Sequence, residues 1–140
     1  MSDTMPPLSH KFDTSIACPF IDFLGIRPLA EGSQEQYSLD FREEHVGNPL
    51  IKTFHGGILA SFGEAVAAMH LAKALTLDDI PECASITFDY LRPAFAGTII
   101  ATPKIVRRGR RITTVSVQLH LEGKLVSIGR FLFPVVRSLT

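Results

Sequence analysis

Residues 57–75 read GILASFGEAVAAMHLAKAL, and this stretch predicts the longest single element of the chain. At about 100° per residue, its apolar side chains fall on two opposite sides of a helix. The large ones are Ile58, Leu59, Phe62, Val66 and Met69, and the smaller ones are Ala60, Ala67, Ala68, Leu71 and Leu75. A helix that is apolar on two sides is buried rather than exposed on one face. We therefore expect one long helix inside the fold.

The segments around this helix alternate between apolar and polar residues, as strands do. Residues 34–41 precede it, and four further strands follow at residues 85–90, 98–106, 112–121 and 125–135. Pro103 implies an edge position or a bulge in its strand. Three consecutive connections of the hairpin type indicate an antiparallel sheet. Because a sheet face and an apolar helix each need a partner, the sequence predicts an α+β fold, in which a curved antiparallel sheet wraps around the helix.

Near the N-terminus, residues 19–26 form a short apolar stretch in which Gly25 can end one helical turn. Before it, residues 1–15 are expected to be a loosely ordered N-terminal segment. Residues 16–140 are then a single domain, since 140 residues are too few for two domains of ordinary size. The second apolar side of the long helix still needs a cover, and a second subunit is the simplest one. We expect a homodimer or homotetramer.

Composition excludes several classes of function. Lys+Arg and Asp+Glu both number 14, so no overall field favours nucleic acid or an anionic membrane. No apolar run approaches the ~18 residues of a membrane span, and the N-terminus does not resemble a signal peptide. Cys18 and Cys83 have no zinc or disulfide spacing, and the histidines lack ligand spacing, so we expect no metal and a cytoplasmic location.

The densest chemical signal reads NPLIKTFHGG, residues 48–57. Backbone N–H groups at a helix start are unsatisfied and can hold an oxyanion, and Gly56 and Gly57 allow a substrate to approach them closely. Glu64 is the only acid between Glu44 and Asp78, and it lies in the middle of the apolar helix. A buried carboxylate is costly unless it is paired or functional. The alternative is a structural Glu64 that caps a group or reaches solvent at the helix edge.

The motif Asn-x₆-His-Gly-Gly is followed here by an acid nine residues after the histidine. This pattern resembles that of the hotdog thioesterases of the phenylacetate-pathway type. The resemblance covers about residues 20–133. It includes the stretches YLRPA at 90–94, RRGRR at 107–111 and GKLV at 123–126. It implies a hotdog fold and hydrolysis of an acyl-CoA to a free acid and coenzyme A. No cofactor is implied, because coenzyme A is part of the substrate.

The resemblance also implies roles for individual residues. Glu64 would be the nucleophile or the base that activates water, and the Gly56 N–H would polarise the thioester carbonyl. Asn48 would hold that carbonyl or the water, and His55 would orient the loop. Glu64 would come from one subunit and the other three residues from its partner. Cys83 stands where relatives often have Ser or Thr, among the substrate-contacting residues.

Four arginines surround Gly109 at an expected turn, and two interpretations of them stay open. Charges of this kind protect a sheet edge, but guanidinium groups also bind phosphate well, so the turn is a candidate clamp for coenzyme A. The residues are Arg107, Arg108, Arg110 and Arg111. For the whole chain, a non-catalytic acyl-CoA binding module and a hotdog hydratase or dehydratase remain as alternatives to the thioesterase.

Overall fold

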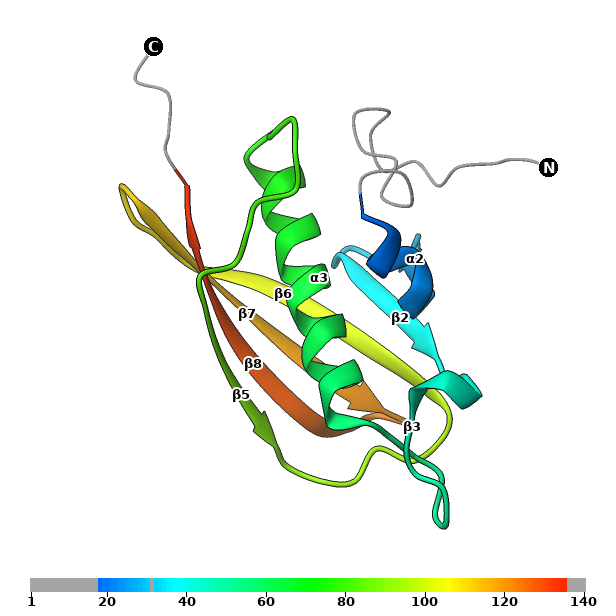
Figure 1. Ribbon diagram of the computed structural model, residues 1–140. Coiled ribbons are helices and arrows are strands. Elements are labelled where there is room, and N and C mark those ends of the chain that lie inside the picture. Colours follow the sequence, from blue (N-terminus) through cyan, green and yellow to red (C-terminus); the bar gives the residue numbers. More distant parts are fainter. Residues whose placement is uncertain (1–17, 31, 136–140) are drawn as a thin grey trace, which may run out of the picture.

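The computed structural model describes residues 18–30 and 32–135 (Figure 1). The predicted loosely ordered segment, residues 1–15, lies outside them. The elements in chain order are α2 (Pro19–Leu24), β1 (Ile26–Leu29), β2 (Gln36–Asp40), the 3-10 helix η1 (Glu43–His45), β3 (Val46–Asn48), β4 (Thr53–Phe54), α3 (Gly56–Ala74), β5 (Ser85–Tyr90), β6 (Thr98–Arg108), β7 (Ile112–Leu121) and β8 (Lys124–Pro134).

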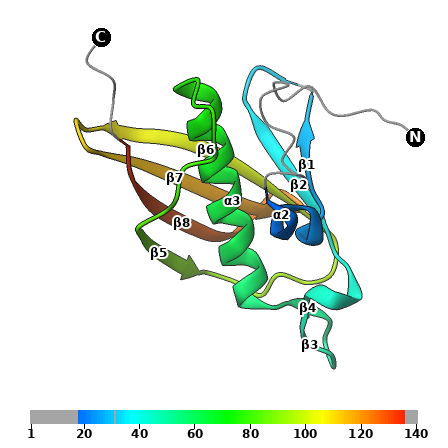
Figure 2. The ribbon, with the colours of Figure 1, turned by 45° about the horizontal axis from the view of Figure 1, so that its top comes forward.

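Six strands form one antiparallel sheet in the order β1-β2-β6-β7-β8-β5. The sheet curves around α3, as Figures 1 and 2 show. This arrangement confirms the predicted α+β hotdog fold. The predicted helix at residues 57–75 is observed one residue earlier, at Gly56–Ala74.

One expected connection is wrong. The sequence suggested hairpins between all four strands after the helix, but β5 pairs with β8 instead of β6. Residues 91–97 therefore cross the end of the sheet to reach β6, which lies between β2 and β7. Alternation of apolar and polar residues fixes which face of a strand is buried, but it does not fix the neighbouring strand.

Pro103 lies in a part of β6 that is an edge of the sheet, as predicted, although β6 as a whole lies between β2 and β7. β6 pairs with β2 only over residues 98–101, and beyond that its second edge has no strand partner among the described residues. Pro103 lies in this part and pairs with Val117 of β7, so its missing N–H costs no ladder hydrogen bond. A bulge follows between Ile105 and Arg107. Strand β1 was not predicted, because it has only four residues and contains Pro28.

Helix α3 packs on the concave face of the sheet and carries much of the core, including fully buried Phe62, Val66 and Leu71. It approaches the sheet closely at Gly63, where a Cβ atom would stand 2.9 Å from the ring of Phe131. Short helix α2 packs against α3 and ends at Gly25, as expected, with a φ of 85°. The two apolar sides of α3 are thus covered by the sheet and, in part, by α2.

Candidate active site

The loop before α3 is held by a buried histidine. His45 is fully buried, and its ring stacks on Phe54 and meets the edge of Phe41. Burial lowers the pKa of His45, and the nearby Arg42 charge acts in the same direction, so the ring is neutral near pH 7. Its carbonyl accepts a hydrogen bond of 2.7 Å from the His55 N–H. The position of His55 is therefore tied to the core.

The peptide between Gly56 and Gly57 is held at both ends. The Gly57 N–H donates to His55 Nδ1 at 2.9 Å, and the Tyr90 hydroxyl donates to the Gly56 carbonyl at 2.8 Å. The next two N–H groups, of Ile58 and Leu59, both donate to the His55 carbonyl. Within the described residues, the Gly56 N–H is the one group of this first turn that has no hydrogen-bond partner. It is left to bind an external acceptor.

The other predicted residues of this loop are His55, Gly57 and Asn48. His55 is the N-cap of α3, and its accepting Nδ1 leaves the proton of the neutral ring on Nε2. Gly57 is exposed, but its N–H is occupied by His55. Asn48 is also exposed, and its Oδ1 accepts from the Leu50 N–H at 3.0 Å. The amide N–H₂ of Asn48 makes no hydrogen bond to the described residues.

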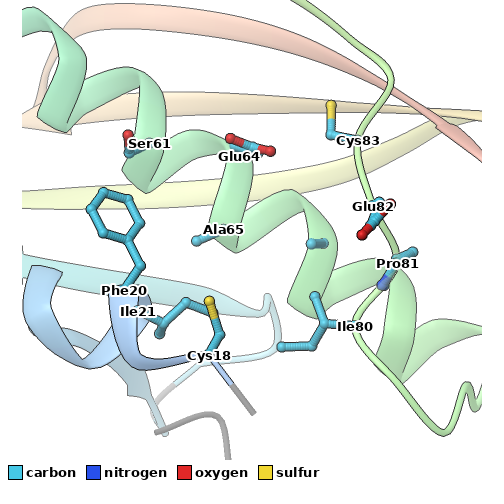
Figure 3. A pocket seen from close by; sticks show the side chains of 11 residues that line it. Cys18, Phe20, Ile21, Ser61, Glu64, Ala65, Ile80, Pro81, Glu82 and Cys83 are labelled. Atoms are coloured by element: carbon cyan, nitrogen blue, oxygen red, sulfur yellow. The ribbon is translucent and has the colours of Figure 1, made fainter.

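Glu64 lies in a hollow of about 500 Å³ between α3, α2 and the segment before β5. In Figure 3 its carboxylate lies between Ser61, one turn earlier on α3, and Cys83. Glu64 is partly exposed, so the expected buried carboxylate is not buried in a single copy of the chain. The reason is local: Ala65 and Ala68 beside it are small, and the hollow they leave is open.

Cys83 faces the same hollow as a protonated thiol. Burial raises its pKa, and the negative charge of Glu64 adds to this. Its S–H donates to the Ser85 carbonyl at 3.2 Å. A thiol in this state is neither an activated nucleophile nor a strong partner for a water molecule. Of Cys83 and Glu64, the carboxylate of Glu64 is therefore the group that can act as a base.

A single copy does not bring the predicted catalytic residues together. Gly56 and Glu64 are eight residues apart on one helix, which is about 12 Å at 1.5 Å per residue. One thioester carbonyl cannot lie within hydrogen-bond reach of both. His55 lies with Gly56 at the helix start, Asn48 pairs with Thr53 in the β3–β4 hairpin that precedes it, and Cys83 lies with Glu64.

The four arginines lie at the β6–β7 hairpin, at the end of the sheet away from the start of α3 (Figures 1 and 2). All four are exposed, and none makes an ion pair or hydrogen bond through its side chain with residues 18–30 or 32–135. Over the same residues, no cluster of His, Cys, Asp or Glu could hold a metal ion, and no helix is long and apolar enough to cross a membrane.

Sequence reasoning missed the walls of the hollow and the bond from Tyr90. Phe20, Ile80 and Glu82 line the hollow around Glu64, but they come from segments far from it in the chain. Tyr90 was noted only as part of a recurring stretch. No pattern in the sequence connects its hydroxyl to Gly56, 34 residues earlier.

Comparison with known proteins identifies the family and the fold. Residues 47–137, more than half of the chain, match the family model described as the acyl-CoA thioesterase N-terminal domain. No curated protein matches the sequence.

Several solved structures are similar. One is a protein from the thioesterase superfamily, with a TM-score of 0.75 and 29% identity over 84% of this chain and 89% of that one. A variant of the phenylacetic acid degradation protein PaaI from Thermus thermophilus has a TM-score of 0.70 and 28% identity, over 84% of this chain and 99% of that one. The E. coli PaaI protein, from the phenylacetic acid degradation operon, shares the fold with a TM-score of 0.68 and 22% identity, over 81% of this chain and 86% of that one.

Proposed function

The chain belongs to the acyl-CoA thioesterase N-terminal domain family and is a PaaI-like hotdog thioesterase, and from this premise we propose that it hydrolyses acyl-CoA at a site shared between two copies. Glu64 of one copy and the Gly56 N–H of the other act on the same thioester. The products are a free acid and coenzyme A. The observation that carries the proposal is the unpartnered Gly56 N–H at the start of α3, about 12 Å along the helix from Glu64.

The free edge of β5 supports the shared site. Among the described residues β5 pairs with β8 on one side only, and Ile86 and Tyr90 on it are 44% and 55% exposed. An exposed edge with apolar side chains favours pairing with another strand. Tyr90, at one end of β5, contacts Gly56, while Cys83, just before the other end, lies beside Glu64. Two copies of β5 pairing antiparallel about a two-fold axis would therefore bring Gly56 of one copy towards Glu64 of the other.

In the reaction, the thioester carbonyl accepts a hydrogen bond from the Gly56 N–H, which stabilises the negative charge that develops on the oxygen. Glu64 removes a proton from a water molecule that attacks the carbonyl carbon, or attacks that carbon itself. In the first case the C–S bond then breaks, and the departing sulfur takes the proton that Glu64 removed from the water. In the second case C–S cleavage leaves an anhydride between the acyl group and Glu64, and a water molecule hydrolyses it to the free acid, restores the carboxylate and supplies the proton for the sulfur. The free amide N–H₂ of Asn48 and the Nε2–H of His55 are further donors for the carbonyl or the water.

The arginine hairpin binds the phosphates of coenzyme A in this proposal. Its four guanidinium groups have no partner among the described residues and suit phosphate geometry. Replacing Arg107, Arg108, Arg110 and Arg111 by Ala should raise KM about tenfold for a CoA thioester, at roughly 0.2–1 kcal/mol for each exposed contact. A pantetheine thioester lacks the distal phosphates, so its KM should not change. An equal change in KM for both thioesters would contradict phosphate binding and would favour the alternative, in which the arginines only protect the sheet edge.

The shared site is tested by combining two inactive variants. Glu64→Gln removes the base, and Gly56→Pro removes the N–H. Each is expected to slow thiol release from an acyl-CoA panel by about 100-fold or more. If the two are co-expressed with different tags and a dimer of one copy of each is purified through both tags, one of its two sites contains neither change. The mixed species should then recover about half of the wild-type activity.

Two results would contradict this arrangement. A mixed species as inactive as its parents would show that each copy holds a complete site. A stable, active monomer in sedimentation at micromolar concentration would exclude both the dimer and the shared site. Tight binding of acyl-CoA by the wild type without any thiol release would instead identify a non-catalytic binding module. Glu122→Gln, in an exposed turn that does not line the hollow around Glu64, is the matched control.

A further inference from the structure

We propose that the hollow beside Glu64 receives the acyl group and selects uncharged, apolar acyl groups over those that end in a carboxylate. This inference rests on the proposed function, because the hollow contacts the acyl group only if Glu64 acts on the thioester. It adds a substrate class, which neither the fold nor the family supplies.

The floor of the hollow is one stripe of α3. Ser61, Glu64, Ala65 and Ala68 line it, at positions i, i+3, i+4 and i+7 of the helix. The two alanines leave room beside the carboxylate, and the stripe continues about 6 Å beyond Glu64 to Ala68. An acyl chain whose carbonyl stands at Glu64 can therefore lie along the helix.

The opposite walls are mostly apolar. Phe20 and Ile21 come from α2, and Ile80 and Pro81 come from the segment after α3 (Figure 3). Phe20 remains 50% exposed in a single copy, although it is a large aromatic side chain. A hydrocarbon chain in the hollow would cover this surface and remove it from water. The walls thus favour an apolar occupant.

The charges in the hollow have one sign. Glu64 and Glu82 are its two charged lining residues, and no Lys or Arg lines it among the described residues. Glu82 lies next to Cys83, on the wall that faces the helix (Figure 3). A second carboxylate at the end of an acyl chain would enter a space that already holds two negative charges and would find no cation. Repulsion between like charges in one hollow opposes the binding of such an acyl group.

The test compares two acyl-CoA substrates of equal length, hexanoyl-CoA and adipoyl-CoA, which differ in a terminal methyl or carboxylate. We expect kcat/KM to be higher for hexanoyl-CoA by a factor on the order of ten, because the two carboxylates that line the hollow repel the terminal carboxylate of adipoyl-CoA. Glu82→Lys should reduce this ratio by raising adipoyl-CoA turnover, whereas Glu122→Lys, on an exposed turn, should leave it unchanged.

The possible results distinguish a failure of the charge selection from a failure of the proposed thioesterase function. Equal kcat/KM for both substrates in the wild type, or a ratio that Glu82→Lys does not change, would overturn the charge selection and leave the thioesterase proposal standing. Absence of thiol release from both substrates would overturn the proposed function itself.

A second variant tests the wall independently of charge. Phe20→Ala should move the preferred length of uncharged acyl chains upward, because it widens the hollow. Phe23→Ala is the matched control, since Phe23 is a similarly exposed ring on α2 that stacks on Phe20 but does not line the hollow. Identical chain-length profiles for the two variants would contradict the placement of the acyl group.

Discussion

At the start of α3, groups far apart in the chain are joined by hydrogen bonds of 2.7–2.8 Å, whereas no hydrogen bond joins the Glu64 carboxylate to a described residue. The helix start is fixed by His45, Ala94 and Tyr90, which bond to His55, Phe54 and Gly56 in turn. The hollow around Glu64 is instead bounded by side chains from three segments.

This difference separates two tasks of a hydrolytic site. An oxyanion donor is effective when it is already oriented, so that no rearrangement is needed as charge develops. A base must stay accessible to water and substrate, and a carboxylate bonded firmly to the protein would be a weaker base. The rigid half and the open half of the candidate site match these two requirements. Substitutions in the two halves should therefore have different consequences.

The largest effect is expected in the open half. Glu64→Gln keeps the shape of the side chain and removes the base, so kcat should fall about 10²–10⁴-fold. Because the carboxylate makes no hydrogen bond to the described residues, the thermal midpoint should stay the same or rise. Thiol release measures the fall in kcat, and a thermal melt of the same preparation measures the midpoint. Activity within about threefold of wild type, which is roughly 0.65 kcal/mol in barrier, would refute the catalytic assignment. An unfolded variant would point to a structural Glu64.

In the rigid half, the donor can be removed without breaking the helix. Gly56 is the first residue of α3, where proline is well tolerated, and His55 has φ −63° and ψ 136°, which suits a residue before proline. Gly56→Pro removes the unpartnered N–H, so kcat should fall about 10²–10³-fold. Gly56→Ala is the matched control, because it adds a Cβ at the same distance of 3.2 Å from the Tyr90 ring and keeps the N–H.

A contrary result here would move the oxyanion site elsewhere. If Gly56→Pro and Gly56→Ala lose the same activity, contact with Tyr90 and not the missing N–H is responsible. If neither loses activity, the carbonyl is held by Asn48 or His55 instead, and the helix start is only a rigid connection.

The same comparison explains what the sequence could predict. The helix start was placed within one residue, because its signals are local: the His55–Gly57 contact spans two residues. Glu64 was identified because a lone acid on an apolar helix is visible in the sequence alone. Phe20, Ile80 and Glu82 could not be assigned to its surroundings, since their directions depend on how α2 and the segment before β5 pack on α3. The β5–β8 pairing was missed for a similar reason, because strand order is decided by long-range packing.

Tyr90 belongs to the rigid half, at the helix start, and its substitution gives the smallest expected effect. Its ring lies against Gly56, and its hydroxyl fixes the carbonyl of the peptide whose N–H is held by His55. Tyr90→Phe keeps the ring and removes one neutral hydrogen bond, which is typically about 0.5–1.5 kcal/mol. If this bond orients the donor in the transition state, kcat should fall roughly 2- to 12-fold, with KM for the acyl-CoA unchanged. Tyr37→Phe, at a buried tyrosine of β2 that bonds Glu35, removes a hydroxyl away from the site and should affect stability but not kcat. A rise in KM with kcat unchanged would instead place the Tyr90 hydroxyl in contact with the substrate, and the helix start would then be held by His55 and the backbone alone.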